Sequence, residues 1–243
     1  MSLYKRPFLL SVIVFFVQKE GGYDMKTNKT ELVFILDRSG SMSGLESDTI
    51  GGYNSLLSKQ RMEEGTATVT TVLFDDRFEL LHDRLDIHAI SPISDKDYFV
   101  RGSTALLDAI GKTINKIGNV QKHTKPEMRA DKVLIIITTD GMENASVEYS
   151  YDQVKMMIER QKSQYGWEFI FLGANIDALS TAHRFGIDSS RAANYRADSM
   201  GTHLNYATLN KTVSKFRSEA KIDDDWKSDI DKDYTDREDK NKS

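Results

Sequence analysis

The chain of 243 residues has no cysteine, only 3 prolines, and no apolar run long enough to span a lipid bilayer. Without cysteine it cannot form a disulfide scaffold, a thiolate zinc site, an iron–sulfur cluster or a cysteine nucleophile. Its 39% hydrophobic and 29% charged residues differ from the composition of collagen-like, mucin-like and wholly disordered chains. The composition therefore indicates a globular protein, and the length of the chain allows one large domain or two small ones.

An excess of positive charge is also missing, because 33 Lys and Arg residues stand against 37 Asp and Glu residues. Residues 219–243 hold 10 acidic and 6 basic residues, which leaves 27 of each in the preceding 218 residues. A neutral body with an acidic end has no electrostatic reason to bind nucleic acid or an anionic membrane. We therefore expect neither as a partner.

The acidic segment 219–243 is predicted to be a charged, flexible tail that the fold does not need. Its apolar surface is too small to offset the free energy of ordering its backbone. One pattern points the other way, since Ile222, Trp226 and Ile230 follow each other at intervals of four residues. That spacing would suit a terminal helix docked on the domain.

The first 24 residues form an apolar N-terminal extension, with Lys5 and Arg6 ahead of the apolar run 8–17. A secretory signal would have this pattern, but no small-residue cleavage site follows, and no cysteine is present for a lipid anchor. A mis-assigned start is slightly favoured, because residues 19–21 can be encoded by a purine-rich ribosome-binding sequence upstream of Met25. We expect a cytoplasmic protein with its domain at 25–218, or an exported one if 1–24 is a genuine signal.

From residue 30 onward, strand-like apolar runs alternate with helical patterns. Strands are predicted at 31–37, 67–74, 78–85, 132–138, 167–172 and 192–195, and helices at 47–62, 103–117, 151–164, 176–185 and 205–216. The residues Asp75, Asp76 and Arg77 are typical of a hairpin turn, so the third strand is expected to be antiparallel and at an edge. The alternation predicts an α/β fold, with a mostly parallel sheet and helices on both faces.

Oxygen-bearing side chains follow two of the buried strands. Asp37, Ser39 and Ser41 lie at and just after the end of the first strand, Asp140 follows the fourth, and Thr104 lies near a helix start. Because the carboxyl ends of parallel strands meet at one edge of a sheet, these groups are expected to lie together. Each motif alone is also typical of a turn or a helix cap. Together they predict a site for a hard cation, Mg²⁺ or Mn²⁺, with Ca²⁺ a weaker candidate.

The sequence Asp37-Arg38-Ser39-Gly40-Ser41 resembles the Asp-x-Ser-x-Ser signature of the von Willebrand factor type A (VWA) domain, the fold of integrin inserted domains. Thr104 matches the threonine of that family, and Asp140, followed by Gly141, matches its second aspartate. All five positions of the family's metal-ion-dependent adhesion site (MIDAS) are present in order. The resemblance covers about residues 30–216 and is closest to bacterial, cytoplasmic-type members.

This resemblance implies a doubly wound six-stranded sheet in the order 3-2-1-4-5-6, with strand 3 antiparallel. It also implies that the three hydroxyls are the direct metal ligands, with the two aspartates bound directly or through water. Ser103 competes with Thr104 for the ligand role. Arg38 fills the variable position of the motif, so we expect it to point to solvent or to pair with an acidic partner.

Two functions are compatible with such a site. The favoured one is a binding module, in which Asp or Glu of a partner protein completes the metal's coordination. The alternative is a Mg²⁺-dependent phosphate-ester hydrolase or phosphotransferase that uses a strand-end aspartate as nucleophile. That chemistry needs a nearby acid or base, yet Ser39 stands where an aspartyl phosphatase carries its second Asp, and no phosphate-binding Gly-rich loop with Lys is present. The sequence does not indicate an oligomeric state.

Overall fold

The computed structural model describes residues 28–242, with side chains up to residue 238. The N-terminal extension 1–24 and both of its interpretations lie outside the described residues. The strands are β1 (Lys29–Asp37), β2 (Thr66–Phe74), β3 (Phe78–Asp86), β4 (Lys132–Thr139), β5 (Glu168–Ala174) and β6 (Ala192–Tyr195). The α-helices are α1 (Glu46–Gln60), α2 (Leu106–His123), α3 (Tyr151–Tyr165), α4 (Ala178–Arg184), α5 (Ser199–Glu219) and α6 (Ser228–Lys242).

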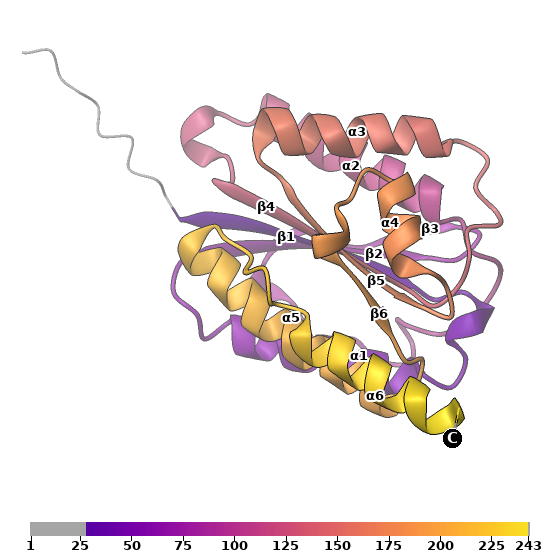
Figure 1. Cartoon of the computed structure of the whole chain (residues 1–243). Helices are drawn as coiled ribbons and strands as arrows, with labels where there is room; N and C mark the ends of the chain where they lie inside the picture. The colour runs from indigo at the N-terminus through magenta and orange to yellow at the C-terminus, as the bar shows by residue number, and fades with distance from the viewer. Residues whose placement is uncertain (1–27, 243) are drawn as a thin grey trace, which may run out of the picture.

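The strands form one sheet in the order β3-β2-β1-β4-β5-β6 (Figure 1). β2 and β3 pair antiparallel, and every other neighbouring pair in this sheet is parallel. The predicted order and the antiparallel edge strand are confirmed. Because Leu36 of β1 lies beside Thr138 of β4, Asp37 and Asp140 stand at the ends of neighbouring central strands.

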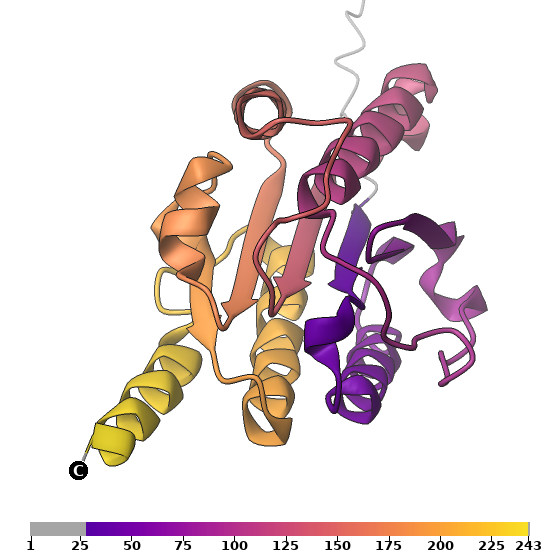
Figure 2. The same cartoon turned by 90° about the vertical axis from the view of Figure 1, so that its right-hand side faces the viewer.

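Alternate side chains of the central strands enter two separate cores, because successive residues of a strand point to opposite faces. Val33 and Ile35 of β1 pack with residues of α2, α3 and α4. Leu32, Phe34 and Leu36 pack instead with residues of α1, α5 and the segment around α6. Figure 2 shows the sheet between these two helical layers. Coverage on both faces is the reason that β1 has a continuous apolar sequence.

Helix α5 begins at Ser199, six residues before the predicted start. The side chain of Asp198 accepts a hydrogen bond from the backbone of Gly201 at 2.8 Å and so caps the helix. Asp198 is a typical N-cap residue, but the apolar pattern of this helix becomes regular only later. No helix in residues 28–242 combines the length and apolar character needed to cross a membrane.

For the described side chains of residues 219–238, the prediction of an unpacked tail is wrong. Ile222, Trp226 and Ile230 are 2%, 8% and 1% exposed and belong to the same core as α1 and α5. The indole Nε1 of Trp226 also donates to the carbonyl of Ser190 at 2.7 Å, and α6 lies along β6 and α5 (Figure 1). The three apolar side chains are buried together, while charged residues such as Asp231 stay exposed. A segment of highly charged composition therefore packs on the domain through a few apolar side chains.

Candidate metal site

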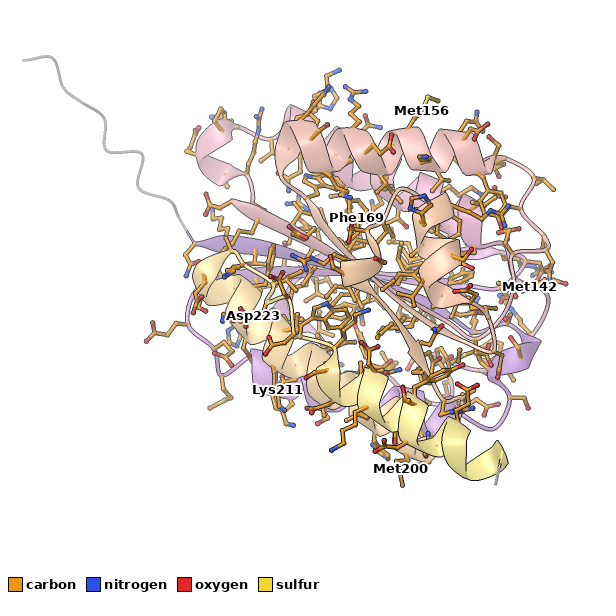
Figure 3. All side chains as sticks on the ribbon, in the orientation of Figure 1. Met142, Met156, Phe169, Met200, Lys211 and Asp223 are labelled. Atoms are coloured by element: carbon orange, nitrogen blue, oxygen red, sulfur yellow. The ribbon has the colours of Figure 1, made fainter. Side chains whose placement is uncertain are left out.

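Three loops at the carboxyl edge of the sheet bring the five predicted site residues together. A 3-10 helix at Gly40–Met42 follows β1 and carries Ser41. Thr104 lies in the loop that leads into α2, and Asp140 directly follows β4. This edge lies at the end of the sheet where the exposed side chain of Met142 is labelled in Figure 3.

The side-chain oxygens of the site form a chain of short contacts. Ser39 Oγ lies 3.0 Å from Ser41 Oγ, and Ser41 Oγ donates to Asp140 Oδ1 at 2.5 Å. Asp37 Oδ1 accepts from the Ser39 backbone N–H at 2.7 Å, and Asp37 Oδ2 accepts from Thr139 Oγ1 at 2.5 Å. The second oxygen of Asp140, Oδ2, is buried and has no hydrogen-bond partner among the described residues. A buried carboxylate oxygen without a partner is unfavourable, and a bound cation would remove that penalty.

Thr104 reaches the same cluster beside Gly141. A Cβ atom added to Gly141 would lie 2.9 Å from Ser41 Oγ and 3.1 Å from Thr104 Oγ1. Because Gly141 has no side chain, the hydroxyls of Ser41 and Thr104 can both occupy the space beside it. Since Ser103 is exposed whereas Thr104 is buried, Thr104 supplies the hydroxyl at this cluster.

Thr104 does not cap helix α2. The helix begins at Leu106, and the residue before it makes no side-chain capping bond. The loop after β4 instead supplies acceptors for backbone N–H groups at and before the helix start. Leu107 N donates to Glu143 Oε2 at 2.8 Å, and Thr104 N donates to Asn144 Oδ1 at 2.9 Å. Sequence reasoning missed Glu143 and Asn144 as positioning residues, since no local pattern links them to a helix start some forty residues earlier.

Burial disfavours the ionised form of both carboxyl groups of the site in the protein without a metal. Burial raises the pKa of Asp37 to about 6, although hydrogen bonds from Thr139 and Ser39 act in the opposite direction. Burial likewise raises the pKa of Asp140, against a hydrogen bond from Ser41. Among the described side chains of residues 28–238, no salt bridge reaches either carboxyl group. The site therefore lacks positive charge that a cation would supply.

The donor set fits a hard divalent cation. It consists of two carboxylates and three hydroxyls, so the two negative charges balance a divalent ion and every ligand atom is oxygen. Within the described chain, no group of three or more His, Cys, Asp and Glu side chains could hold a metal. A metal at this edge therefore depends on the serine and threonine hydroxyls.

The expectation that Arg38 points to solvent is wrong. Its side chain is completely buried, with Nε donating to Asp75 Oδ2 at 2.9 Å and Nη2 donating to Glu79 Oε2 at 2.7 Å. Arg101 donates Nε to the same Asp75 oxygen at 2.6 Å. Both guanidinium groups lie over the ring of Phe99, at 5.4 and 5.3 Å from its centroid. Arg38 is therefore part of the support beneath the site and is not free to contact a partner.

Asp75 connects the two loops that carry the hydroxyls. Its carboxylate holds Arg38 in the first loop and Arg101 in the second, and its carbonyl accepts from Ala105 N at 2.8 Å. Burial raises the pKa of Asp75, but hydrogen bonds from Arg101, the Arg77 backbone and Arg38 outweigh burial and leave the pKa below its ordinary value. Asp75 is thus ionised at neutral pH and fixes the spacing of the loops.

We expect Asp75→Asn to weaken metal binding roughly tenfold, because the loops lose the ionic bridge between them. The free energy of unfolding should fall by about 1.5 to 3 kcal/mol, the usual contribution of a hydrogen bond to a charged group. Calorimetric titration with Mn²⁺ and urea unfolding measure the two effects. Asp95→Asn, at an exposed aspartate, is the matched control and should change neither. Parental metal affinity in Asp75→Asn would contradict the positioning role.

An open cleft of about 650 Å³ lies at the same edge of the sheet. Met142, from the loop after Asp140, lines it together with Asn175, Tyr195 and Tyr234. Met142 is 71% exposed, so the cleft presents an apolar side chain to solvent close to the predicted metal ligands. A molecule bound at the cluster would have further surface to contact here.

No protein-family model and no curated protein sequence matches the chain. Solved structures match it in fold. Proximal thread matrix protein 1 from the mussel byssus, with a zinc-occupied MIDAS motif, has a TM-score of 0.52 and 15% identity, over 76% of this chain and 46% of that chain. A von Willebrand factor type A structure from Catenulispora acidiphila has a TM-score of 0.52 and 11% identity, over 76% and 42% of the two chains. The manganese-loaded TRAP protein of Plasmodium vivax has a TM-score of 0.51 and 17% identity, over 73% and 72%.

At these identities the similarity concerns the fold alone. The chain spans less than half the length of the mussel and Catenulispora proteins that it matches. Two of the three neighbours carry a divalent metal, zinc in one and manganese in the other. The matched region and the sheet order agree with the fold that the sequence resemblance implied. The chain has the von Willebrand factor type A fold.

Proposed function

We propose that the chain is a metal-dependent protein-binding module with one Mg²⁺ or Mn²⁺ ion at Asp37, Ser39, Ser41, Thr104 and Asp140. The observation that carries this proposal is a cluster of oxygens at one edge of the sheet. Ser39 Oγ contacts Ser41 Oγ, which donates to Asp140, and the Thr104 hydroxyl lies beside Gly141. The second oxygen of Asp140 is buried with no hydrogen-bond partner among the described residues. The two carboxylates balance the charge of the ion, and the hydroxyls add ligands without further negative charge. The bound ion can therefore still attract an anionic group.

The anionic group is a carboxylate of Asp or Glu on a partner protein. Mg²⁺ prefers six oxygen ligands, and protein sites usually leave some of these positions to water. A partner carboxylate replaces one water and gains a direct ionic bond to the metal. The neighbouring cleft beside Met142 gives the partner additional surface to contact. The zinc in the MIDAS motif of the mussel protein and the manganese of the TRAP protein support binding of a divalent ion.

The phosphate-ester alternative has less support. Asp37 would be the nucleophile in such an enzyme, yet it is completely buried, and both of its carboxylate oxygens accept hydrogen bonds from Ser39 and Thr139. In the part of the chain that the structure describes, no lysine or histidine hydrogen-bonds to any of the five site residues. We expect no hydrolysis of p-nitrophenyl phosphate in the presence of Mg²⁺.

Metal removal tests the proposal. Immobilised protein should capture a partner from a cell extract in Mg²⁺ and lose it in chelator, because the partner's carboxylate has no ion to bind. Circular dichroism should stay unchanged, since the apolar strands hold the sheet. Replacing the partner's contacting Asp or Glu by Asn or Gln should abolish capture as well. Undiminished capture in chelator would refute the mechanism, and loss of secondary structure would assign the ion to the fold.

A further inference from the structure

A second cavity, of about 410 Å³, opens at the amino edge of the sheet, at the opposite end from the metal site. It lies between the C-terminal halves of α2 and α3 and the loop that leads into β4 (Figure 1). Ile114, Val133 and Trp167 form its apolar floor and are 1%, 3% and 5% exposed. A volume of this size lies within the range of small-molecule sites.

Positive charge surrounds the opening of this cavity. Lys122, Arg129 and Arg160 line it, and the one lining acid, Asp131, accepts a hydrogen bond from the backbone of Lys29. Arg129 donates to two backbone carbonyls, and Arg160 donates to a side-chain amide, so these contacts neutralise neither charge. Among the described side chains of residues 28–238, none of the ion pairs involves the three cations. Three positive side chains and one negative side chain, Asp131, line the cavity, and the excess of positive charge attracts an anion.

Aromatic and amide side chains complete the walls. Tyr165, at the end of α3, is 58% exposed beside the buried Trp167. Asn119 and Gln161 also line the cavity and offer amide groups. Gly118 also lines the cavity, and a Cβ there would lie 3.7 Å from the Gln161 amide nitrogen, an ordinary contact distance. These groups suit a flat ring that both stacks and forms hydrogen bonds.

We propose that this cavity binds a small organic anion that joins a flat heterocyclic ring to a phosphate, the class of the nucleoside monophosphates. The phosphate binds among Lys122, Arg129 and Arg160, because guanidinium and ammonium groups are the preferred phosphate partners. The ring lies against the aromatic side chains and the amides hydrogen-bond to its edge. The length of the sheet separates this site from the metal cluster, so binding requires no metal and is independent of the function proposed above.

Calorimetric titration of the full chain with AMP, in chelator, tests the proposal. We expect one AMP per chain, with adenosine and inorganic phosphate each at least roughly tenfold weaker, because each lacks half of the contacts. Arg160→Gln should weaken AMP binding roughly tenfold. Lys155→Gln, on the same helix but outside the cavity lining, is the matched control and should leave the affinity unchanged.

Gly118→Met provides a second test that does not depend on charge. The added Cβ meets its nearest neighbour at an ordinary contact distance, so the helix should form, and the long side chain should fill the cavity and abolish AMP binding. Absence of AMP binding to the parent, equal affinity for inorganic phosphate and AMP, or parental affinity in a folded Gly118→Met protein would each overturn the proposal.

Discussion

A chain that ends at Ser218 should unfold at a temperature roughly 10 °C or more below that of the full chain, because it loses part of the core. Ile222, Trp226 and Ile230 are buried against the layer of α1 and α5, and removing them exposes the apolar surface that they cover. Polar contacts are lost as well. Lys227 Nζ donates to the carbonyl of Ala192 at 2.7 Å, at the first residue of β6.

The single change Trp226→Ala should lower the free energy of unfolding by about 3 to 5 kcal/mol, the range for an aromatic residue removed from a core. Urea unfolding followed by circular dichroism measures this difference. Asp236→Ala, at an exposed position of α6, is the control and should leave the stability at the parental value. A truncated chain with the parental melting temperature would show that the segment after Ser218 contributes nothing to the fold.

Asp37→Asn should have two opposite effects, loss of metal binding and a gain of about 2 to 3 kcal/mol in the stability of the metal-free protein at pH 7. Burial holds the pKa of Asp37 near 6 in the folded protein, above its ordinary value of 3.8. The ionised form is therefore less stable in the fold than in the unfolded chain. Asn is neutral and can keep both bonds, since its Nδ2 can donate to Thr139 Oγ1, whose hydroxyl can donate to the carbonyl of Gly141.

The sign of the pH dependence follows from the raised pKa. Between about pH 4 and pH 6 the folded protein holds a proton on Asp37 that the unfolded chain has released, so stability falls as the pH rises through this window. Asp37→Asn should lack this loss. Urea unfolding of both metal-free proteins from pH 4 to pH 7 measures the difference. Parallel pH profiles, or an Asn variant that is less stable at pH 7, would contradict the account.

The predictions that the structure confirms are those that depend on residues close together in the sequence. The apolar runs of β1 and β4 are long because both strands are buried on two faces, and their order along the chain is enough to place Asp37 and Asp140 at one edge. The position of a strand along the chain is therefore predictable where burial on both faces makes its apolar run continuous.

Pairings between distant segments were not predictable. Arg38 is buried because Asp75 and Glu79, 37 and 41 residues later, accept hydrogen bonds from its guanidinium, and nothing near Arg38 in the sequence indicates this. Helix α2 starts late because Glu143 satisfies one of its first N–H groups. The spacing of Ile222, Trp226 and Ile230 did indicate a docked segment, but the high charge of residues 219–243 favoured a tail, because overall composition does not reveal that a few apolar side chains pack together.

If the oxygens of these five side chains hold one divalent ion, calorimetric titration of Mn²⁺ into Thr104→Val should show weakened binding. The substitution removes one hydroxyl and keeps the shape and the charge of the site, so only a ligand role predicts a loss of affinity. Ser103→Ala removes the adjacent exposed hydroxyl and is the matched control. We expect one ion per chain in the parent and in Ser103→Ala, and binding at least roughly tenfold weaker in Thr104→Val. Saturable binding of equal strength in all three proteins, or none in the parent, would contradict it.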